Sequence, residues 1–391
     1  MAFFVQKPIP RGILWLLFFS SVLAVLSFPV VARAWFDWLN GGSDWRQGDW
    51  LINMGSGFIR RGLMGDSLIA LSDATGWPLL AVAQLFQGLL FVMLVFVVWL
   101  IGLLCPNRRL LAFLAASPAI FLIFWAGDIQ GTMRKELFGL LALALLALNG
   151  ICRWRGPVLP VAAVVLFTLG CIGNILHVFM LPALIAGLLM TREAGLISSR
   201  QFAGLVITSL AMSALWMGVA VWFREVPELT GMCARLVARG LDKDICGGAI
   251  GWTVAGNIDH ASELSLKLTA GALKRYVIVA ALCMLPVALS FRFFAERRDL
   301  AILAAITFLP LLPLYGVATD WGRWISISYT AWALLLLQGH ASGRFTLLKT
   351  PPTGLIAGLL LLALVISPEH GIGWQPGGAV RSVLAAAQDF R

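Results

Sequence analysis

Long runs of apolar residues, broken by short polar segments, are the feature that most constrains the fold of this chain. The first run covers residues 13–31, and a helix of that length crosses a bilayer core of roughly 30 Å. Only 12% of the residues are charged, whereas charged residues make up about a quarter of soluble globular domains. The chain is therefore expected to be a polytopic membrane protein.

The same runs predict a bundle of helices. Backbone groups in lipid must be bonded within a segment or within a closed barrel, and these runs lack the alternation of barrel strands. We predict an all-α, polytopic transmembrane helical bundle, a single integral membrane domain over residues 1–391. The expected spans, about eleven by length and apolarity, are residues 13–31, 78–104, 110–126, 137–148, 157–172, 175–190, 202–223, 276–291, 300–317, 325–337 and 354–366.

Lysine and arginine gather in alternate connections, which sets the predicted orientation. With a cytoplasmic N-terminus, the inner connections hold pairs such as Arg108 with Arg109 and Arg153 with Arg155. The net charge of +10 then reflects topology, and no nucleic-acid motif or partner is indicated. The first run exceeds the signal-peptide core of about 7–15 residues, so a retained span is favoured over cleavage near Ala32-Arg33-Ala34.

Two outer segments follow from this orientation: a first outer loop at residues 35–77 and a large outer loop at residues 224–275. The large loop contains Asp259 and His260 and also two cysteines, Cys233 and Cys246. A disulfide between these cysteines would close a short loop in an oxidising compartment. Two unpaired thiols are the alternative, because spacing alone does not give the geometry of a disulfide.

Polar residues of unusual combination lie in the expected outer segments, beside the ends of apolar runs. A charge in such a place is costly unless it is paired or functional. The segment from Asp44 to Gly65 is the richest of these, with carboxylates, paired arginines and glycines. We predict an outer-face active site built from Asp44, Asp49, Arg60, Arg61, Arg134, Lys135, His177, Asp320 and Arg323.

These residue types suit the chemistry of lipid-linked sugars. A carboxylate acts as a general base toward a sugar hydroxyl, and arginines bind a phosphate or pyrophosphate with paired hydrogen bonds. Asp49 is the candidate catalytic residue, with Asp44 as its competitor; the cations, Asp320 and His177 are candidates for substrate binding. No metal is required, since Arg and Lys can neutralise a leaving phosphate. A divalent metal held by Asp44 and Asp49 is the alternative.

The run from Gly48 to Gly65, with Asp49-Trp50-Leu51-Ile52-Asn53 and Arg60-Arg61-Gly62, resembles the acidic first-outer-loop signature of GT-C membrane glycosyltransferases. The likeness also extends to bacterial surface-polysaccharide polymerases. It implies a GT-C-like fold in the bacterial inner membrane, and a polyprenyl-phosphate or pyrophosphate sugar donor for surface-glycan or glycolipid assembly. The family's catalytic Asp falls on Asp49. Ile52-Asn53 replaces a common aromatic, and Arg60-Arg61 adds charge, which favours a polymerase-like grip on pyrophosphate.

Each candidate also has a purely structural interpretation. The cations and carboxylates could pair with sequence neighbours, His177 could be a packing histidine, and Arg60 and Arg61 could lie on an interfacial amphipathic helix with Phe58, Ile59, Leu63 and Met64 toward lipid. The pairs in question are Asp49 with Arg46, Arg134 or Lys135 with Asp128 or Glu136, and Asp320 with Arg323.

Two functions from other classes compete with an enzyme. One is a transporter or flippase for a lipid-linked or anionic solute, which would place charges or unwound helices near the bilayer midplane and often shows internal repeats. The other is a non-catalytic partner among polysaccharide-assembly proteins, such as a subunit of an export complex. Only the enzyme predicts that one carboxylate and one or two arginines are essential.

Overall fold

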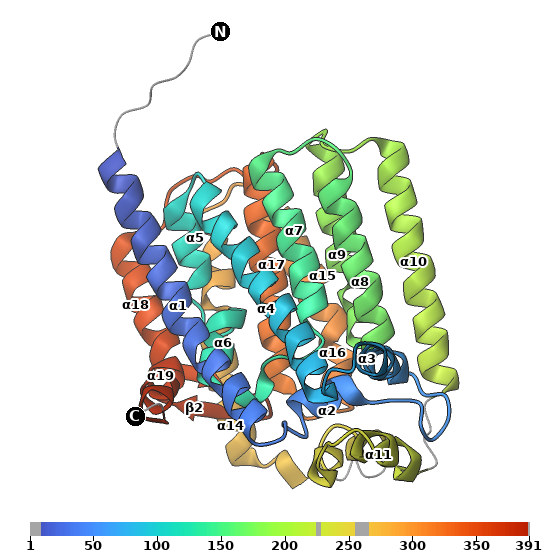
Figure 1. Cartoon of the computed structure of the whole chain (residues 1–391). Coiled ribbons are helices and arrows are strands. Elements are labelled where there is room, and N and C mark those ends of the chain that lie inside the picture. Colours follow the sequence, from blue (N-terminus) through green and yellow to red (C-terminus); the bar gives the residue numbers. More distant parts are fainter. Residues whose placement is uncertain (1–8, 224–227, 255–265, 390–391) are drawn as a thin grey trace.

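The computed structural model describes residues 9–223, 228–254 and 266–389. They form a helical bundle with a layer of short elements across one end (Figure 1). Asp259 and His260 of the large loop lie outside the described residues. One two-stranded antiparallel sheet accompanies the helices, and the predicted all-α class is confirmed.

Six helical segments among the described residues are long and apolar enough to cross a membrane. Three shorter apolar helices lie beside them, so helix length alone does not give the expected eleven spans. The six are α1 (Ile9–Leu39), α4 (Leu79–Leu104), α9 (Leu176–Glu193), α10 (Ser199–Trp222), α14 (Ala270–Ser290), and α15 (Arg297–Phe308) continued by η3 (Leu309–Leu311) and α16 (Leu312–Tyr315). The shorter helices are α7 (Leu137–Cys152), α8 (Val158–Gly173) and α18 (Thr353–Val365).

The centre of the bundle is formed by α7 and α17 (Trp321–Ala341), both of which are buried along almost their whole length. Small residues allow close approach of helices inside a membrane, and polar side chains bond between them. At Gly150 of α7, an added Cβ would lie 2.8 Å from Gln338 Cγ of α17. The Gln338 amide in turn donates to the Gly187 carbonyl of α9 at 2.8 Å. Three helices are thus joined at one level.

One expected span is broken into two pieces. Residues 110–126 fall in α5 (Arg108–Ala115) and α6 (Phe121–Gly127), and Pro118 lies between these helices. Backbone groups that a break releases inside a membrane protein must find other partners. Here the N–H of Phe121 donates to Thr330 Oγ1 at 3.0 Å, and Ser117 Oγ donates to the Cys283 carbonyl at 3.0 Å.

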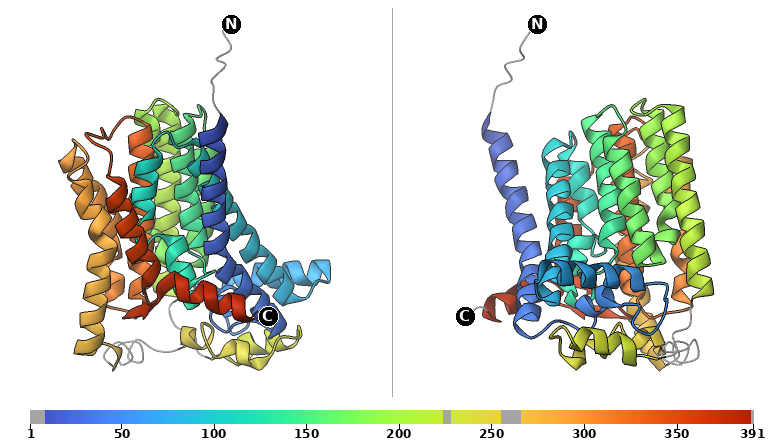
Figure 2. Two further views of the ribbon diagram at one scale, coloured as in Figure 1. Left: turned by 90° about the vertical axis from the view of Figure 1, so that its left-hand side faces the viewer. Right: turned by 45° about the vertical axis from the view of Figure 1, so that its right-hand side comes forward.

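The connections that were predicted to face the cytoplasm meet at one end of the bundle. Arg344, after α17, forms ion pairs with Glu193 at the end of α9 and with Asp299 at the start of α15. The start of α1 lies at this same end, opposite to α2 (Arg46–Leu51) and α3 (Gly62–Thr75) (Figures 1 and 2). The sorting of basic connections is therefore consistent with the predicted orientation.

The opposite end carries the layer of short elements (Figure 2). Besides α2 and α3 it contains η1 (Ile129–Gly131), α11 (Thr230–Val237), η2 (Lys243–Cys246), α12 (Gly251–Val254), β1 (Ile366–Pro368), β2 (Trp374–Pro376) and α19 (Gly378–Asp389). Ser367 of β1 is in register with Gln375 of β2. A disulfide joins Cys233 of α11 to Cys246 of η2.

Helices extend into both of the predicted outer loops. The first begins only after Leu39, because α1 continues through residues 35–39, and it contains two helices. The large loop ends before Ala270, where α14 begins after a cap by the Thr269 hydroxyl. These helices thus extend beyond the apolar runs from which the loop limits were predicted.

Candidate functional site

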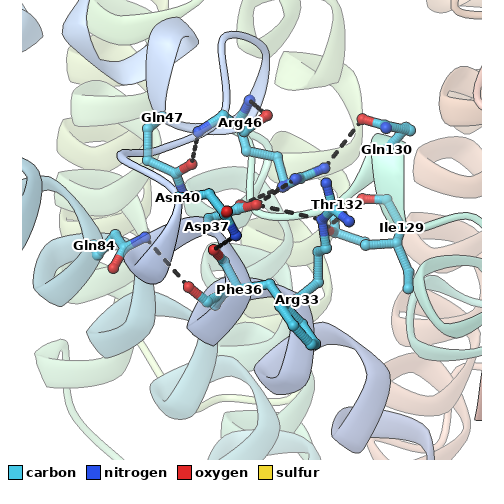
Figure 3. A network of polar contacts seen from close by, with 12 residues as sticks. Arg33, Phe36, Asp37, Asn40, Arg46, Gln47, Gln84, Ile129, Gln130 and Thr132 are labelled. Carbon is cyan, nitrogen blue, oxygen red and sulfur yellow. Dashed lines mark hydrogen bonds and ion pairs between the residues drawn. The ribbon is translucent and has the colours of Figure 1, made fainter. Parts of the chain in front are cut away.

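A buried ion pair fixes the start of α2 against the end of α1 (Figure 3). Arg46 donates from Nε and Nη2 to the two oxygens of Asp37, each at 2.7 Å, and from Nη1 to Gln130 Oε1 at 3.0 Å. Arg33 adds a second cation to Asp37 at 3.3 Å. Such a bidentate pair is geometrically specific. Arg46 is therefore the partner of Asp37, and the alternative in which it pairs with Asp49 is not found.

The backbone at Met133 links α2 to the segment that precedes α7. Met133 has a φ of 56°, a left-handed conformation that is uncommon for a residue other than glycine. Its carbonyl accepts hydrogen bonds from Trp50 Nε1 at 2.8 Å and from Gln87 Nε2 at 3.0 Å. These contacts offset the backbone strain. They hold Arg134 and Lys135, the next two residues, beside the helix that carries Asp49.

Close backbone approaches explain the glycines of the motif between Gly48 and Gly65. A Cβ on Gly65 would lie 2.0 Å from the carbonyl oxygen of Ile52, and one on Gly55 would lie 2.4 Å from that of Gly231 in α11. Asn53, where the resemblance leads one to expect an aromatic, is fully buried and donates to the carbonyls of Leu51 and Met232. The segment between α2 and α3 is thus packed closely against the start of α3 and against α11.

A cavity of about 1700 Å³ lies at this end of the molecule. Its wall includes seven of the nine predicted site residues, which come from segments far apart in the sequence. They are Asp44, Asp49, Arg60, Arg61, Arg134, Asp320 and Arg323. The predicted convergence of outer segments on one site is therefore observed in the geometry.

Asp49 is buried in the wall of this cavity, with only 3% of its surface exposed. Its Oδ2 has no hydrogen-bond partner among the described residues. Burial by itself raises the pKa of a carboxyl. Lys135 and then Arg61 and Arg134 outweigh that effect, so the pKa of Asp49 lies below its ordinary value. The carboxylate form of Asp49 is therefore favoured, and its buried Oδ2 has no hydrogen-bond partner in the described structure.

The cations around Asp49 also have unused donors. Lys135 is fully buried, and its Nζ has no partner among the residues described. Burial lowers the pKa of Lys135 to about 8, although Asp49 opposes this shift. Arg61 Nε and Arg134 Nε likewise have no partner, and the Arg134 guanidinium lies 5.3 Å from the ring centre of Trp45. The predicted alternative pairing of Arg134 and Lys135 with neighbouring acids is not found.

Arg323, at the N-terminal end of α17, forms ion pairs with two acids. Its Nη2 lies 2.9 Å from Glu136 Oε2, and its Nη1 lies 2.8 Å from Asp320 Oδ2. The Asp320–Arg323 pair, which was the structural alternative, is thus present, and it forms part of the cavity wall. Arg60 also lines the cavity, where burial and then Arg61 lower its pKa to about 10.

The interfacial-helix alternative for Arg60 and Arg61 is only half matched. Phe58 and Leu63 are exposed, whereas Ile59 and Met64 are buried in the core. Both arginines precede α3, which begins at Gly62, and both lie on the cavity wall. They are therefore placed to contact a ligand in the cavity.

Asp44 and His177 differ from Asp49 in their surroundings. Asp44 lines the cavity but packs on the disulfide-bonded loop, where its carbonyl accepts the N–H of Ala249 at 3.0 Å. His177 is fully buried and does not line the cavity. Its Nδ1 lies 3.0 Å from the Asn174 carbonyl, and its ring covers Gly170. The structure therefore favours the packing interpretation of His177, while Asn174 reaches the cavity wall.

The sequence interpretation missed several residues of the cavity wall, among them a histidine. His370, between β1 and β2, lines the cavity, and its Nδ1 lies 2.8 Å from Asp128 Oδ2. A signal existed, since Glu369 and His370 directly follow the last apolar run and so fall at the predicted outer face. The partnership with Asp128 spans 242 residues and could not be found from sequence spacing.

Within residues 9–223, 228–254 and 266–389, no group of three or more His, Cys, Asp or Glu side chains is arranged to hold a metal ion.

No family model matches this sequence, and no curated protein or solved structure matches it at a significant level.

Proposed function

We propose that this protein is a membrane glycosyltransferase or glycan polymerase that uses a polyprenyl-phosphate or pyrophosphate sugar donor. The observation that carries the proposal is the environment of Asp49. An ionised carboxylate with a free oxygen lies at a large cavity, among cations whose donors have no partner in the described structure.

The cations around Asp49 favour an anionic ligand at this part of the cavity. The acids near Arg46 and Arg323 are already used in ion pairs, whereas Arg61 Nε, Arg134 Nε and Lys135 Nζ have no hydrogen-bond partner in the described structure. Buried cations without partners are costly, and a phosphate or pyrophosphate would offset that cost. Arg61 and Arg134 line the cavity and would bind the donor phosphate, while the buried Lys135 would add positive charge that stabilises the phosphate when it leaves.

Apolar residues border the same cavity and suit the lipid part of such a donor. Val221 at the end of α10 and Val317 after α16 line the cavity and are more than 60% exposed. Because α10 and α16 belong to membrane-span candidates, a polyprenyl chain could remain in the bilayer while its phosphate enters the polar part of the cavity.

This function implies a finer topology than helix lengths establish. We infer eleven passes in a GT-C-like arrangement, with α5 and α6 together making one pass and α15 with α16 making another. The cavity would then open on the extracytoplasmic face of a bacterial inner membrane. Asp49 would orient the acceptor hydroxyl or take its proton, while Arg60 and Arg323 would assist in phosphate binding.

Glycan and lipid-carrier analysis of cells tests the proposal. Asp49→Asn keeps the size of the side chain but removes its charge, and we expect it to reproduce the deletion strain, with shortened glycan and accumulated lipid-linked precursor. Asp44→Asn is the matched control, because Asp44 lines the same cavity. Wild-type glycan in an Asp49→Asn strain with normal protein levels would refute the role of Asp49.

A further inference from the structure

Asp128 and His370 form a dyad at the wall of the cavity. Asp128 lies directly after α6 and is buried, with 4% of its side chain exposed. Its Oδ2 contacts His370 Nδ1 at 2.8 Å and also accepts a hydrogen bond from the His370 backbone N–H. A carboxylate that accepts from Nδ1–H leaves Nε2 of the neutral ring as a lone-pair acceptor.

The backbone holds the position of His370 firmly. Its carbonyl accepts the N–H of Arg323, and the Gly371 carbonyl accepts the N–H of Gly322, so this loop caps the start of α17. A Cβ on Gly322 would lie 1.6 Å from the Glu369 carbonyl oxygen, so that only glycine fits there. The side chain of His370 remains 36% exposed and lines the cavity.

We propose that His370, oriented by Asp128, is the residue that accepts the proton of the acceptor hydroxyl in this cavity. The inference deepens the proposed function and rests on it for the identity of the reaction. The acceptor oxygen bonds to the anomeric carbon, and the bond from that carbon to the phosphate oxygen breaks. The phosphate leaves with the electron pair, and the hydroxyl proton moves to His370 Nε2.

We assign different roles to Asp49 and to His370 of the dyad. Lys135 and the arginines hold Asp49 as a carboxylate of low basicity, which suits hydrogen bonding to a hydroxyl better than removing its proton. His370 Nε2 has a lone pair that can take the proton when Nδ1–H is bonded to Asp128. Asp128 acts as a positioning residue, because it fixes the tautomer and orientation of the ring.

The charged groups that face His370 come from several elements. Asp128 follows α6, Glu369 is adjacent in the loop, and Asp320 precedes α17 and is electrostatically coupled to His370. Burial and then Asp128 raise the pKa of Glu369, with Arg275 among the opposing charges. Lys267 also acts on Glu369, and Asp320 is itself paired with Arg323, so both acids and cations lie near this loop.

Two readouts test the dyad, and the first needs no substrate. The chain has four histidines, so ¹⁵N-histidine labelling gives few signals, and His370→Gln assigns the one of interest. We expect His370 to carry its proton on Nδ1 with Nε2 bare, and Asp128→Asn to disturb that tautomer. A proton on Nε2 with Nδ1 bare would overturn the proposal.

The second readout is the phenotype of variants in cells. His370→Gln can still donate to Asp128 but cannot take a proton, and we expect it to reproduce the deletion strain. His340→Gln is the matched control, since its Nδ1 contacts the Phe345 carbonyl away from the cavity. Wild-type behaviour of His370→Gln overturns the dyad, whatever Asp49→Asn does. Conversely, loss in His370→Gln with a normal Asp49→Asn strain leaves the dyad standing and refutes the proposed role of Asp49.

Discussion

Arg46 binds Asp37 through two hydrogen bonds of 2.7 Å, and it does so nine positions away in the sequence rather than pairing with the nearer Asp49. Both side chains are almost fully buried. Because Arg46 is bonded to Asp37, it does not pair with Asp49. The same bonds fix the position of α2, the helix on which Asp49 lies. The cations that do surround Asp49 all come from more distant segments.

The Asp37–Arg46 pair should dominate the stability of this end of the molecule. Arg46→Ala leaves a buried carboxylate with only the partly exposed Arg33, and we expect a loss of about 3–5 kcal/mol, typical of breaking a buried pair. Thermal unfolding in detergent measures this. Arg239→Ala, which removes an exposed pair with Asp73, is the control and should change little. Equal losses in the two variants would contradict the structural role of the buried pair.

Lys135 should make stability depend on pH in a defined window. Its pKa is about 8 in the folded protein, against an ordinary value of 10.5, so the cost of its burial is fully present below pH 8. Between about pH 8 and 10.5 the unfolded chain binds more protons, and stability should rise with pH. Lys135→Met should remove this rise and should lower transfer roughly 100-fold. An unchanged pH dependence of the melting temperature would show that Lys135 is not the cause.

Arg61 should bind phosphate, whereas Arg33 should not. Both line the cavity, but Arg33 is paired with Asp37 and Arg61 Nε has no partner within the described structure. Arg61→Ala should weaken binding of undecaprenyl phosphate about 10- to 100-fold, the range for hydrogen bonds to a charged group. Native mass spectrometry with undecaprenol as the uncharged competitor measures this. Equal effects of Arg61→Ala and Arg33→Ala would argue against a specific phosphate site.

The Cys233–Cys246 disulfide should support the wall of the cavity. It closes a loop with a sequence separation of 13, and loops of that size contribute about 3 kcal/mol in the chain-entropy model. The Cys233→Ser/Cys246→Ser protein should be cut faster by trypsin at Arg239. Cleavage at Arg155, in the connection between α7 and α8, serves as the internal control. Unchanged cleavage at Arg239 would show that the loop is held by its other contacts alone.

Sequence patterns predicted the helical class and seven charged residues of the cavity wall for a physical reason. Apolar runs report lipid contact, and polar residues at their alternate ends must meet on one face, which brought Asp49, Arg134 and Arg323 together. Residues whose role depends on a partner could not be assigned in this way. His177 was considered both as a packing histidine and as a site residue, and the contact that decides for packing, its ring against Gly170, could not be predicted from the sequence. Glu136 was considered for Arg134 or Lys135, but it binds Arg323 instead.

The limits of the membrane spans were harder to predict from the sequence than the face on which the polar residues meet. At the break between α5 and α6, Thr330 accepts the N–H of Phe121, and Ser117 donates to the carbonyl of Cys283. Hydrogen bonds to such distant residues leave no pattern in the local sequence. Similarly, α1 extends to Leu39 because Asp37 finds a partner in Arg46. A charged residue that would end a lipid-facing helix is tolerated when a neighbouring segment neutralises it.

The central claim is transfer of sugar from a lipid carrier at the Asp49 cavity, and an assay with purified components tests it most directly. The lipid-linked precursor from deletion cells is added, with acceptor glycan, to vesicles that contain the wild-type protein or Asp49→Asn. We predict that the wild type consumes the precursor and releases one polyprenyl phosphate or pyrophosphate per unit transferred, while Asp49→Asn releases none. Movement of intact precursor across the bilayer without release of the carrier would contradict the account and identify a transporter.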